Sequence, residues 1–229
     1  MLSAIIVAGG SSHRMGFDKL LAAIGGEPVI AHAIRAFERA DCVSEIVLVA
    51  REQQHEEIKK MFSSAGFKKI RTIVPGGERR QDSVQAGLSR IDREAKYVAV
   101  HDAGRPLITP EQIERVFEQC RIHRAAALAQ PVNDTLKRVD PDLVVIGSVD
   151  RHQLYAMQTP QIFDRKIIQD AYQSVYAQNA SVTDEVSAVE RLGHKIALVL
   201  NDDFNFKITY PRDLPLADFI LRERASDRR

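Results

Sequence analysis

The stretch AIIVAGGSSHRMGFDKLL, residues 4–21, decides the fold because it joins an apolar run to a glycine-rich loop. Residues 4–8 predict a short buried strand, since a continuous run of β-branched and small apolar side chains is typical of a sheet covered on both faces. Gly9 and Gly10 end this strand, and their lack of a side chain lets the backbone approach a ligand closely. A strand that stops at such a loop predicts a binding site at the edge of a sheet.

The loop after the paired glycines carries Arg14 and Lys19, two cations that could meet phosphate oxygens. It is not a P-loop, because Phe17 follows Gly16 where that motif needs a lysine, and Lys19 comes too late. It is not a G-x-G-x-x-G loop either, which removes the main support for a dinucleotide-dependent dehydrogenase. Taken alone, the loop fits a phosphate-binding site or a tight turn with two solvated cations.

Strand-like and helix-like segments alternate along the rest of the chain. Further short β-branched runs predict strands at residues 45–50, 70–74, 97–101 and 195–200. Apolar residues with the helical period predict helices at residues 28–39, 110–120, 164–178, 184–192 and 211–224. Thr109, Pro110 and Gln112 have the pattern of a capping box at the start of one of them. We therefore expect an α/β fold, with a Rossmann-like, mainly parallel sheet and helices on both faces.

The alternation fails between about residues 132 and 157, where strand-like pieces flank a turn at Pro141 and Asp142. This pattern predicts a β-arm that protrudes from the main sheet. No linker or internal repeat divides the sequence, so we expect a single domain of residues 1–229 that carries this arm.

Composition excludes several classes of protein. The chain has 229 residues and a formal net charge of +1, which argues against nucleic acid or an anionic membrane as its main partner. No window approaches the roughly 18 apolar residues that a transmembrane helix needs. The two cysteines, Cys42 and Cys120, cannot form a disulfide framework, which suits a reducing compartment. We expect a cytoplasmic protein.

A second glycine-rich segment, PGGERRQDSVQAGL, occupies residues 75–88. Gly77 precedes a predicted helix that carries Asp82 and Ser83 near its start. The exposed N–H groups of a helix N-terminus and a hydroxyl can hold an anion or the edge of a base. A glycine turn followed by a helix cap is the alternative interpretation.

The segment HDAGRP, residues 101–106, lies where a predicted strand ends, which is where open α/β sheets bind ligands. Asp102 is a natural Mg²⁺ ligand, because this ion combines carboxylate oxygens with substrate phosphates. Arg105 could grip a phosphate with two parallel hydrogen bonds. Alternatively, Asp102 and Arg105 pair with each other.

Polar motifs continue through the arm and beyond it. Asp134 with Thr135 and Asp150 with Arg151 lie on the arm, and T-P-Q begins at Thr159. Thr183 is the expected N-cap of the helix at residues 184–192. In FNFKITYP, residues 204–211, alternation places Phe204 on an apolar face and Lys207 on the polar face, where a solvated lysine is the usual outcome.

The first loop, A-G-G-x-S-x-R-M-G-x-D-K, resembles the triphosphate loop of nucleotidyltransferases, and its spelling is most similar to molybdenum-cofactor guanylyltransferases. The later motifs resemble another branch. GG-x-x-R-x-x-S-V, H-D-A-x-R-P, D-T-x-K-R, V-D-R, T-P-Q, T-D-E and K-I-T-x-P-x-D-L, in this order and spacing, resemble the 2-C-methyl-D-erythritol 4-phosphate cytidylyltransferase family over about residues 4–221. The chain departs from the family's usual pattern at Val7, Gly9, Ser12, Asp18 and Gly104.

The resemblance implies transfer of CMP from CTP to 2-C-methyl-D-erythritol 4-phosphate, with release of pyrophosphate in isoprenoid precursor synthesis. It implies that Arg14 and Lys19 hold the triphosphate, that Lys207 stabilises charge at the α-phosphate, and that Mg²⁺ binds near Asp102. The nucleotide would contact Ala8, Gly9, Gly10, Gly77, Ser83 and Ala103. The sugar-alcohol phosphate would contact Asp102, Arg105, Thr135, Arg151, Thr159 and Thr183. In the family the arm is exchanged between subunits, which implies a homodimer.

Three other functions remain as alternatives. Ribitol-5-phosphate cytidylyltransferases share the fold and the CTP loop, and acceptor shape alone separates them. Guanylyl transfer to the molybdenum cofactor fits the first loop, but the arm motifs and T-P-Q speak against it. A non-catalytic nucleotide-binding module would not need Lys19, Asp102 and Lys207 together, because binding alone requires no such charge cluster.

Overall fold

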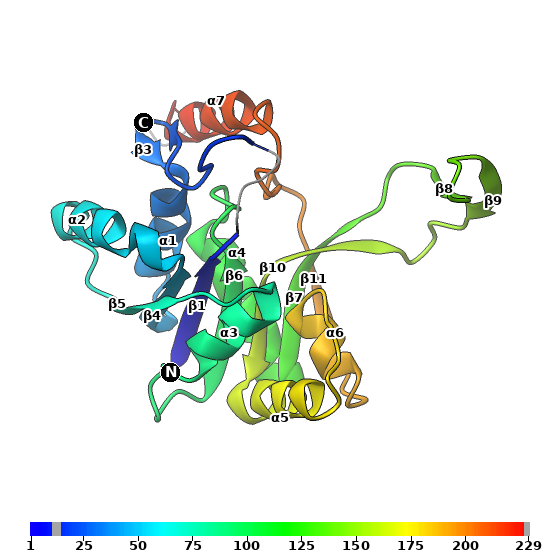
Figure 1. Ribbon diagram of the computed structural model, residues 1–229, viewed down its shortest axis with the longest axis horizontal. Coiled ribbons are helices and arrows are strands. Elements are labelled where there is room, and N and C mark those ends of the chain that lie inside the picture. The colour runs from blue at the N-terminus through cyan, green and yellow to red at the C-terminus, as the bar shows by residue number, and fades with distance from the viewer. Residues whose placement is uncertain (11–14, 227–229) are drawn as a thin grey trace.

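The computed structural model describes residues 1–10 and 15–226, and its centre is a seven-stranded sheet (Figure 1). The strand order is β11-β7-β10-β6-β1-β4-β5, and β10 alone in this sheet runs antiparallel to both of its neighbours. Its strands are β1 (Leu2–Ala8), β4 (Val43–Ala50), β5 (Ile70–Pro75), β6 (Tyr97–Asp102), β7 (Ala125–Pro131), β10 (Tyr155–Asp164) and β11 (Ala197–Leu200). The expected mainly parallel sheet is confirmed.

Two smaller ladders lie outside this sheet. The first pairs β2 (Ala23–Ile24) with β3 (Glu27–Pro28). The second is an antiparallel hairpin of β8 (Leu136–Val139) and β9 (Val145–Val149), which occupies the segment where the alternation of strands and helices fails. Figure 1 shows this hairpin at the end of a long arm that leaves the body between β7 and β10.

Helices cover both faces of the sheet, so the molecule has three layers. The helices are α1 (Val29–Arg39), α2 (His55–Ala65), α3 (Arg80–Leu88), α4 (Pro110–His123), α5 (Arg165–Ala177), α6 (Glu185–Glu190) and α7 (Asp213–Ser226), with a short 3₁₀ turn at Glu52–Gln54. One core packs α1, α2, α4 and α7 against the sheet, and the other packs α3, α5 and α6. Within β1 the side chain of Ile6 belongs to the first core and that of Ile5 to the second, as the two-residue period of a strand requires.

Helix caps show how local sequence sets these boundaries. The predicted capping box is confirmed, because Thr109 Oγ1 accepts a hydrogen bond from the backbone N–H of Gln112 at 3.3 Å and the Gln112 side chain accepts one from Thr109 at 3.0 Å. The prediction that Thr183 caps α6 is wrong. Asp184 is the N-cap and accepts from the N–H of Ser187 at 2.9 Å, because its carboxylate lies one residue closer to the unpaired amides.

Sequence patterns missed two central strands, β7 and β10, and misassigned the faces of residues 204–211. The strand β7 reads AAALAQP, which is too rich in alanine to signal a strand by propensity. The alternation expected for residues 204–211 is wrong, because Phe204 is 54% exposed and Asn205 is 1% exposed. Asn205 is buried because its side-chain amide donates hydrogen bonds to Gln158 at 3.1 Å and to the carbonyl of Thr159 at 3.0 Å.

The order of the strands creates a crevice between β1 and β6. From β1 the chain runs outward to β4 and β5, and then crosses to place β6 on the opposite side of β1. Open α/β sheets bind ligands beyond the carboxyl ends of the strands at such a switch point. The paired glycines of both segments follow strands that end at this edge, and the HDAGRP segment begins in the last two residues of β6. No helix within residues 1–10 and 15–226 is long and apolar enough to cross a membrane.

Candidate active site

A cavity of about 270 Å³ lies at the carboxyl ends of β1 and β6. The loop after β1, the start of α3, the end of β6 and the segment before α7 all contribute to its wall. Eight of the predicted site residues line this cavity: Ala8, Gly9, Gly10, Lys19, Gly77, Ser83, Asp102 and Lys207. Arg14 lies outside the described residues. The tertiary fold therefore joins segments that are far apart in the sequence at the edge predicted for a ligand.

Asp102, the last residue of β6, is the centre of the charged groups in this cavity. One of its carboxylate oxygens accepts a hydrogen bond from Nε of Arg80 at 3.0 Å, and the other accepts one from Nζ of Lys207 at 2.8 Å. Burial opposes ionisation of Asp102, but Arg80 and Lys207 outweigh it and hold the pKa of this carboxyl well below its usual range. Arg105 is a more distant partner, with Nε 4.0 Å from the carboxylate.

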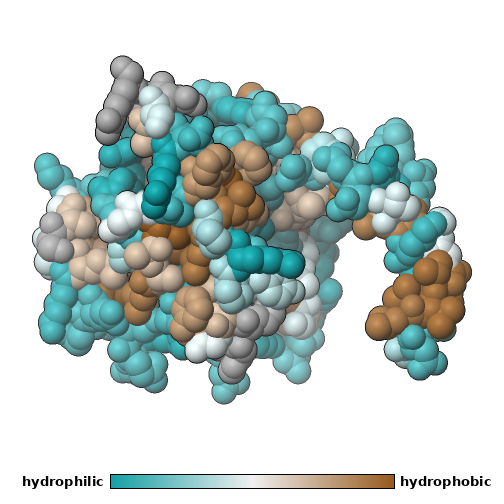
Figure 2. Space-filling view, turned by 90° about the horizontal axis from the view of Figure 1, so that it is seen from above, coloured by the Kyte–Doolittle hydropathy of each residue, from teal (hydrophilic) through white to brown (hydrophobic). Residues whose placement is uncertain are grey.

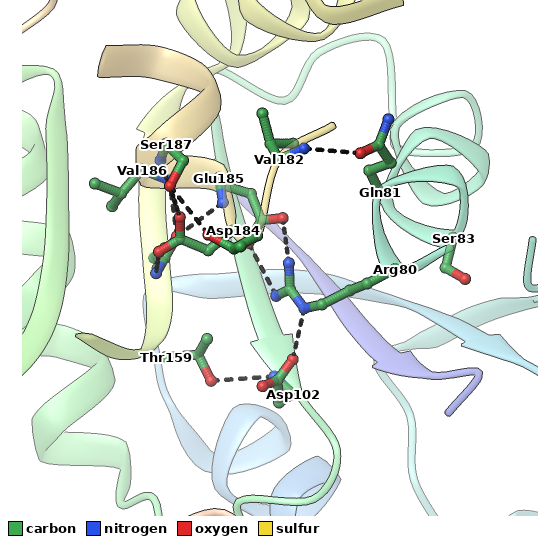
Figure 3. A network of polar contacts seen from close by, with 12 residues as sticks. Arg80, Gln81, Ser83, Asp102, Thr159, Val182, Asp184, Glu185, Val186 and Ser187 are labelled. Atoms are coloured by element: carbon green, nitrogen blue, oxygen red, sulfur yellow. Dashed lines mark hydrogen bonds and ion pairs between the residues drawn. The ribbon is translucent and has the colours of Figure 1, made fainter. Parts of the chain in front are cut away.

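Arg80 also bridges Asp102 to Glu185, as Figure 3 shows. Its two terminal nitrogens donate to the Glu185 carboxylate at 2.6 and 3.0 Å, a bidentate pair in which Glu185 is fully buried. The hydroxyl of Tyr172 donates to the same carboxylate at 2.9 Å. Burial by itself would lower the pKa of Arg80, yet the neighbouring Glu185 and Asp102 raise it above its usual value. The guanidinium is therefore a fixed positive charge at the cavity wall.

Sequence reasoning assigned no role to Arg80 or Glu185. Arg80 stands in the GG-x-x-R motif and Glu185 in T-D-E, so both residues were visible in the pattern. Their pairing spans 105 residues and could not be read from spacing. No local signal indicates this pair, because charged residues near a helix start are usually exposed, and the partner that a buried charge requires can lie anywhere in the chain.

Lys19 and Lys207 both lie beside Gly104 at the cavity wall. Nζ of Lys19 donates a hydrogen bond to the carbonyl of Ile208 at 2.7 Å. A Cβ atom placed on Gly104 would lie 3.6 Å from Nζ of Lys19 and 3.7 Å from Cγ of Lys207. With Arg80, these lysines line the cavity with positive charge, which suits a polyanionic ligand.

The two glycine segments pack against each other at the cavity floor. Ser83 Oγ accepts a hydrogen bond from the backbone N–H of Gly77 at 3.1 Å. A Cβ atom on Gly77 would lie 2.3 Å from Cβ of Asp82, closer than real atoms approach, so this loop can reach α3 only with glycine there. A Cβ atom on Gly9 would lie 3.1 Å from the Ser83 hydroxyl. Backbone N–H groups can therefore face a ligand at close range.

The residues expected at the acceptor are distributed differently. Thr159 is buried, and its hydroxyl accepts from the N–H of Asp102 at 3.1 Å, so it fixes the end of β6 and does not line the cavity. Ala103 is also buried, and its N–H donates to the carbonyl of Val7 at 3.0 Å. The Arg105 guanidinium donates to the carbonyl of Asn205 at 2.8 Å.

Three further acceptor candidates lie outside the cavity wall. Thr183 is exposed just before α6, and its hydroxyl lies 3.3 Å from that of Ser187. Thr135 precedes β8 and Arg151 follows β9, so both lie on the arm that projects away from the body. The Arg151 guanidinium donates to the carbonyl of Asn133, at the base of the same hairpin. The structure therefore does not bring Thr135 and Arg151 to this cavity.

The carboxylate of Asp102 suits a metal ion that is held mainly by the phosphates of a bound substrate. Among the described residues, no three histidine, cysteine or acidic side chains cluster as a metal site would require. Mg²⁺ commonly binds through one or two carboxylates together with substrate phosphates, and it keeps several waters. Asp102 can supply such a carboxylate at the cavity wall.

A larger cavity, of about 430 Å³, lies between α1, α4 and α7. Two of the arginines that line it are held in ion pairs, Arg35 with Glu27 and Arg224 with Asp203, and no glycine segment reaches it within the described residues. The smaller cavity combines the switch point of the sheet, the glycine segments and the unusual cluster around Asp102. It is therefore the better candidate for an active site.

Comparison with known proteins identifies related chains. The model of the family described as 2-C-methyl-D-erythritol 4-phosphate cytidylyltransferase (IspD) matches residues 2–223. A protein of that name from Halalkalibacterium halodurans is 39% identical over 224 residues, with 97% of each chain covered. One from Caldanaerobacter subterraneus subsp. tengcongensis is 38% identical over 229 residues, with 97% of this chain and 99% of that chain covered.

Solved structures give the same comparison in three dimensions. The crystal structure of 4-diphosphocytidyl-2C-methyl-D-erythritol synthase from Anaerococcus prevotii superposes with a TM-score of 0.85 at 31% identity, covering 96% of each chain. The crystal structure of 2-C-methyl-D-erythritol 4-phosphate cytidylyltransferase from Thermus thermophilus has a TM-score of 0.78 at 26% identity. That match covers 97% of this chain and all of the other.

Proposed function

The chain belongs to the 2-C-methyl-D-erythritol 4-phosphate cytidylyltransferase family, and from this we infer its reaction. It transfers CMP from CTP to 2-C-methyl-D-erythritol 4-phosphate in isoprenoid precursor synthesis. Pyrophosphate leaves, and 4-diphosphocytidyl-2-C-methyl-D-erythritol forms. The observation that carries this inference is the cavity at the carboxyl ends of β1 and β6, where Lys19, Arg80 and Lys207 converge beside two glycine segments.

The reaction depends mainly on the positioning of the two substrates and on positive charge around their phosphates. A phosphate oxygen of the acceptor attacks the α-phosphorus of CTP, and the bond from that phosphorus to the bridging oxygen of pyrophosphate breaks. Two polyanions must meet, so cations are the first requirement. At about 4 Å and an effective dielectric constant near 20, one unit-charge pair contributes roughly 4 kcal/mol. Only the part that is stronger in the transition state than in the ground state accelerates the reaction.

We assign these roles to individual cations. Lys19, together with Arg14, holds the triphosphate. Lys207 also lines the cavity and stabilises the charge that develops at the α-phosphate. Its hydrogen bond to Asp102 supports this role, because it keeps the ammonium at the cavity wall before the nucleotide binds. Arg80 keeps Asp102 ionised when Lys207 turns to the phosphate.

We propose that the nucleoside end of CTP lies against the glycine segments. Ala8, Gly9 and Gly10 line one side of the cavity, and Gly77 and Ser83 line the other. Ala103 would shape this end through its backbone, since its side chain is buried. Mg²⁺ would be held by Asp102 and the nucleotide phosphates, and it neutralises phosphate charge when bound.

We further propose that the enzyme acts as a homodimer through its arm. The arm end exposes large apolar side chains, and Figure 2 shows a hydrophobic cluster there; the exposed residues include Leu143, Val144, Val145 and Ile146. An isolated hairpin is marginally stable, so this apolar surface needs a partner. In a dimer with exchanged arms, Thr135 and Arg151 would complete the partner's acceptor site together with Arg105 and Thr183, and Thr159 would support that site through its hydrogen bond to the backbone of Asp102. Both cysteines are free thiols, which supports a cytoplasmic location.

The test is pyrophosphate release with CTP and Mg²⁺, compared between 2-C-methyl-D-erythritol 4-phosphate and ribitol 5-phosphate. We expect release with the first acceptor, and none when the metal is chelated with EDTA. Release with ribitol 5-phosphate alone would keep the nucleotide chemistry but overturn the acceptor. Release with GTP in place of CTP would overturn the assignment of the nucleotide.

A further inference from the structure

Asp18 ties the loop that carries Lys19 to the segment that follows β4. One of its carboxylate oxygens accepts a hydrogen bond from Nη2 of Arg51 at 2.7 Å, and the Gln54 side-chain amide donates to the same oxygen. The other oxygen accepts from the backbone N–H of Leu20 at 3.0 Å. Because Asp18 and Leu20 flank Lys19, this carboxylate closes a short turn around the lysine.

The position of the Lys19 ammonium depends on this turn. Lysine has a flexible four-carbon side chain, so its charge takes a defined place only when its backbone is fixed. Nζ of Lys19 lies at the cavity wall and donates to the carbonyl of Ile208 at 2.7 Å. The residue is thus held at its backbone by Asp18 and at its ammonium by the segment before α7.

Arg51 and Gln54 do not line the cavity, so their contact with Asp18 has no direct part in the reaction. The Asp18 and Arg51 side chains are 22% and 35% exposed, and the pair is partly shielded from water. Arg51 Nε and Gln54 Oε1 are buried and have no hydrogen-bond partner within the described ranges. Asp18 accepts the side-chain hydrogen bonds that Arg51 and Gln54 donate. Removing its carboxylate would leave further polar atoms of these two side chains unpaired, which is unfavourable.

We propose that Asp18, Arg51 and Gln54 form a positioning site for Lys19, which we call the Asp18 cluster. The cluster fixes the loop on the rigid end of β4 and so sets where the ammonium of Lys19 meets the triphosphate. This inference rests on the proposed function, because the place of Lys19 matters only if Lys19 acts on CTP. The cluster makes Asp18 and Arg51 determinants of turnover although neither touches substrate.

The experiment measures pyrophosphate release by the full chain with CTP, Mg²⁺ and 2-C-methyl-D-erythritol 4-phosphate. Asp18→Asn and Arg51→Gln should each lower kcat about ten- to a hundredfold, because a misplacement of roughly 1 Å has an effect of that order. The KM for the acceptor should not change. Arg51→Lys keeps the charge and should recover part of the loss. In a Lys19→Ala background, Asp18→Asn should lower kcat no further.

Arg35→Gln is the matched control, because Arg35 makes a similar partly buried pair with Glu27, at 28% and 40% exposure, away from the candidate active site. It should leave kcat unchanged. Two outcomes would overturn the inference while leaving the proposed function intact. One is normal kcat in Asp18→Asn when Lys19→Ala is inactive, and the other is an equal fold-loss from Asp18→Asn with and without Lys19. Normal turnover in Lys19→Ala itself would overturn the role of Lys19, and the positioning site with it.

Discussion

Nζ of Lys207 lies 2.8 Å from a carboxylate oxygen of Asp102, although 105 residues separate them in the sequence. Arg80 occupies the other oxygen of the same carboxylate. The carboxylate is thus held between two cations that come from different elements. This arrangement keeps positive charge at the cavity wall before substrate binds, because Asp102 balances part of it until a polyanion arrives.

Replacing either lysine at the cavity should remove activity and leave the fold intact. Lys19→Ala and Lys207→Ala should each lower kcat by about 10²- to 10³-fold, the range for loss of one group that stabilises transition-state charge. Loss of Lys207 leaves Asp102 paired with Arg80, so the temperature of thermal unfolding should change little. Steady-state pyrophosphate release and thermal unfolding test both parts, with the exposed Lys166→Ala as control. Near-normal turnover would remove that lysine from the mechanism.

Replacing Arg80 should affect stability as well as turnover. Arg80→Met leaves the fully buried Glu185 without its cation, and removing one partner of a buried ion pair costs about 3 kcal/mol or more. The adjacent Arg79 pairs with Asp82 at the surface, so Arg79→Met should change the free energy of unfolding little. Urea denaturation of the two variants makes the comparison. Equal stability of both would show that the Arg80–Glu185 pair is not needed for folding.

Replacing Gly104 by alanine should be tolerated, whereas replacing Gly77 by alanine should weaken nucleotide binding. At Gly104 the new methyl group would contact both lysines at an ordinary 3.6–3.7 Å. Gly104→Ala should therefore keep kcat and raise the free energy of unfolding by about 0.4–1 kcal/mol, through the less flexible unfolded chain. At Gly77 the methyl group would lie 2.3 Å from Asp82, so Gly77→Ala should shift the loop from α3 and raise the KM for CTP. An unchanged KM for CTP in Gly77→Ala would place the nucleotide elsewhere.

The proposed exchange of arms predicts that two inactive proteins restore activity together. Arg151→Ala removes the arm's arginine and Lys19→Ala removes a cation of the cavity. A mixed dimer should contain one site with neither defect, so partial activity should return after subunit exchange. Pyrophosphate release is measured on the mixture, and exchange is verified with differently tagged subunits. Absence of recovery in verified mixed dimers would contradict a site shared between subunits.

The two cysteines should be unreactive in the folded protein. Burial raises the pKa of Cys42 to about 11 and that of Cys120 to about 12, and the nearby Glu114 and Asp164 act in the same direction. Iodoacetamide should therefore modify neither thiol at pH 8 until the protein unfolds, because the thiolate is the nucleophile. An unfolded thiol has a pKa of about 8.5, lower than in the folded protein, so the folded state holds its thiol protons more tightly. The free energy of unfolding should therefore keep the full contribution of these thiols below about pH 8.5 and lose it as the pH rises toward 11. Mass spectrometry and unfolding at about pH 8 and pH 10, on either side of the unfolded pKa, test both statements.

Much of the fold could be predicted because its signals are local. The apolar run at residues 4–8 gives β1, and the box of Thr109 and Gln112 gives the start of α4. The strands β7 and β10 could not be predicted. The first is mostly alanine, and the second has T-P-Q within it, so burial between neighbouring strands decides their structure more than propensity does.

The candidate site, like the fold, could be predicted from the sequence only in part. The sequence by itself determined that cations and glycines follow strand ends, since strand, loop and residue type are all written within a few positions of Gly9 and Gly77. Only the tertiary structure decided that Lys207 faces Asp102 and that Arg80 joins it to Glu185. Such pairs depend on how strands and helices far apart in the chain are brought together. The physical reason is that a buried charge must find an opposite charge nearby in space, wherever that partner lies in the sequence.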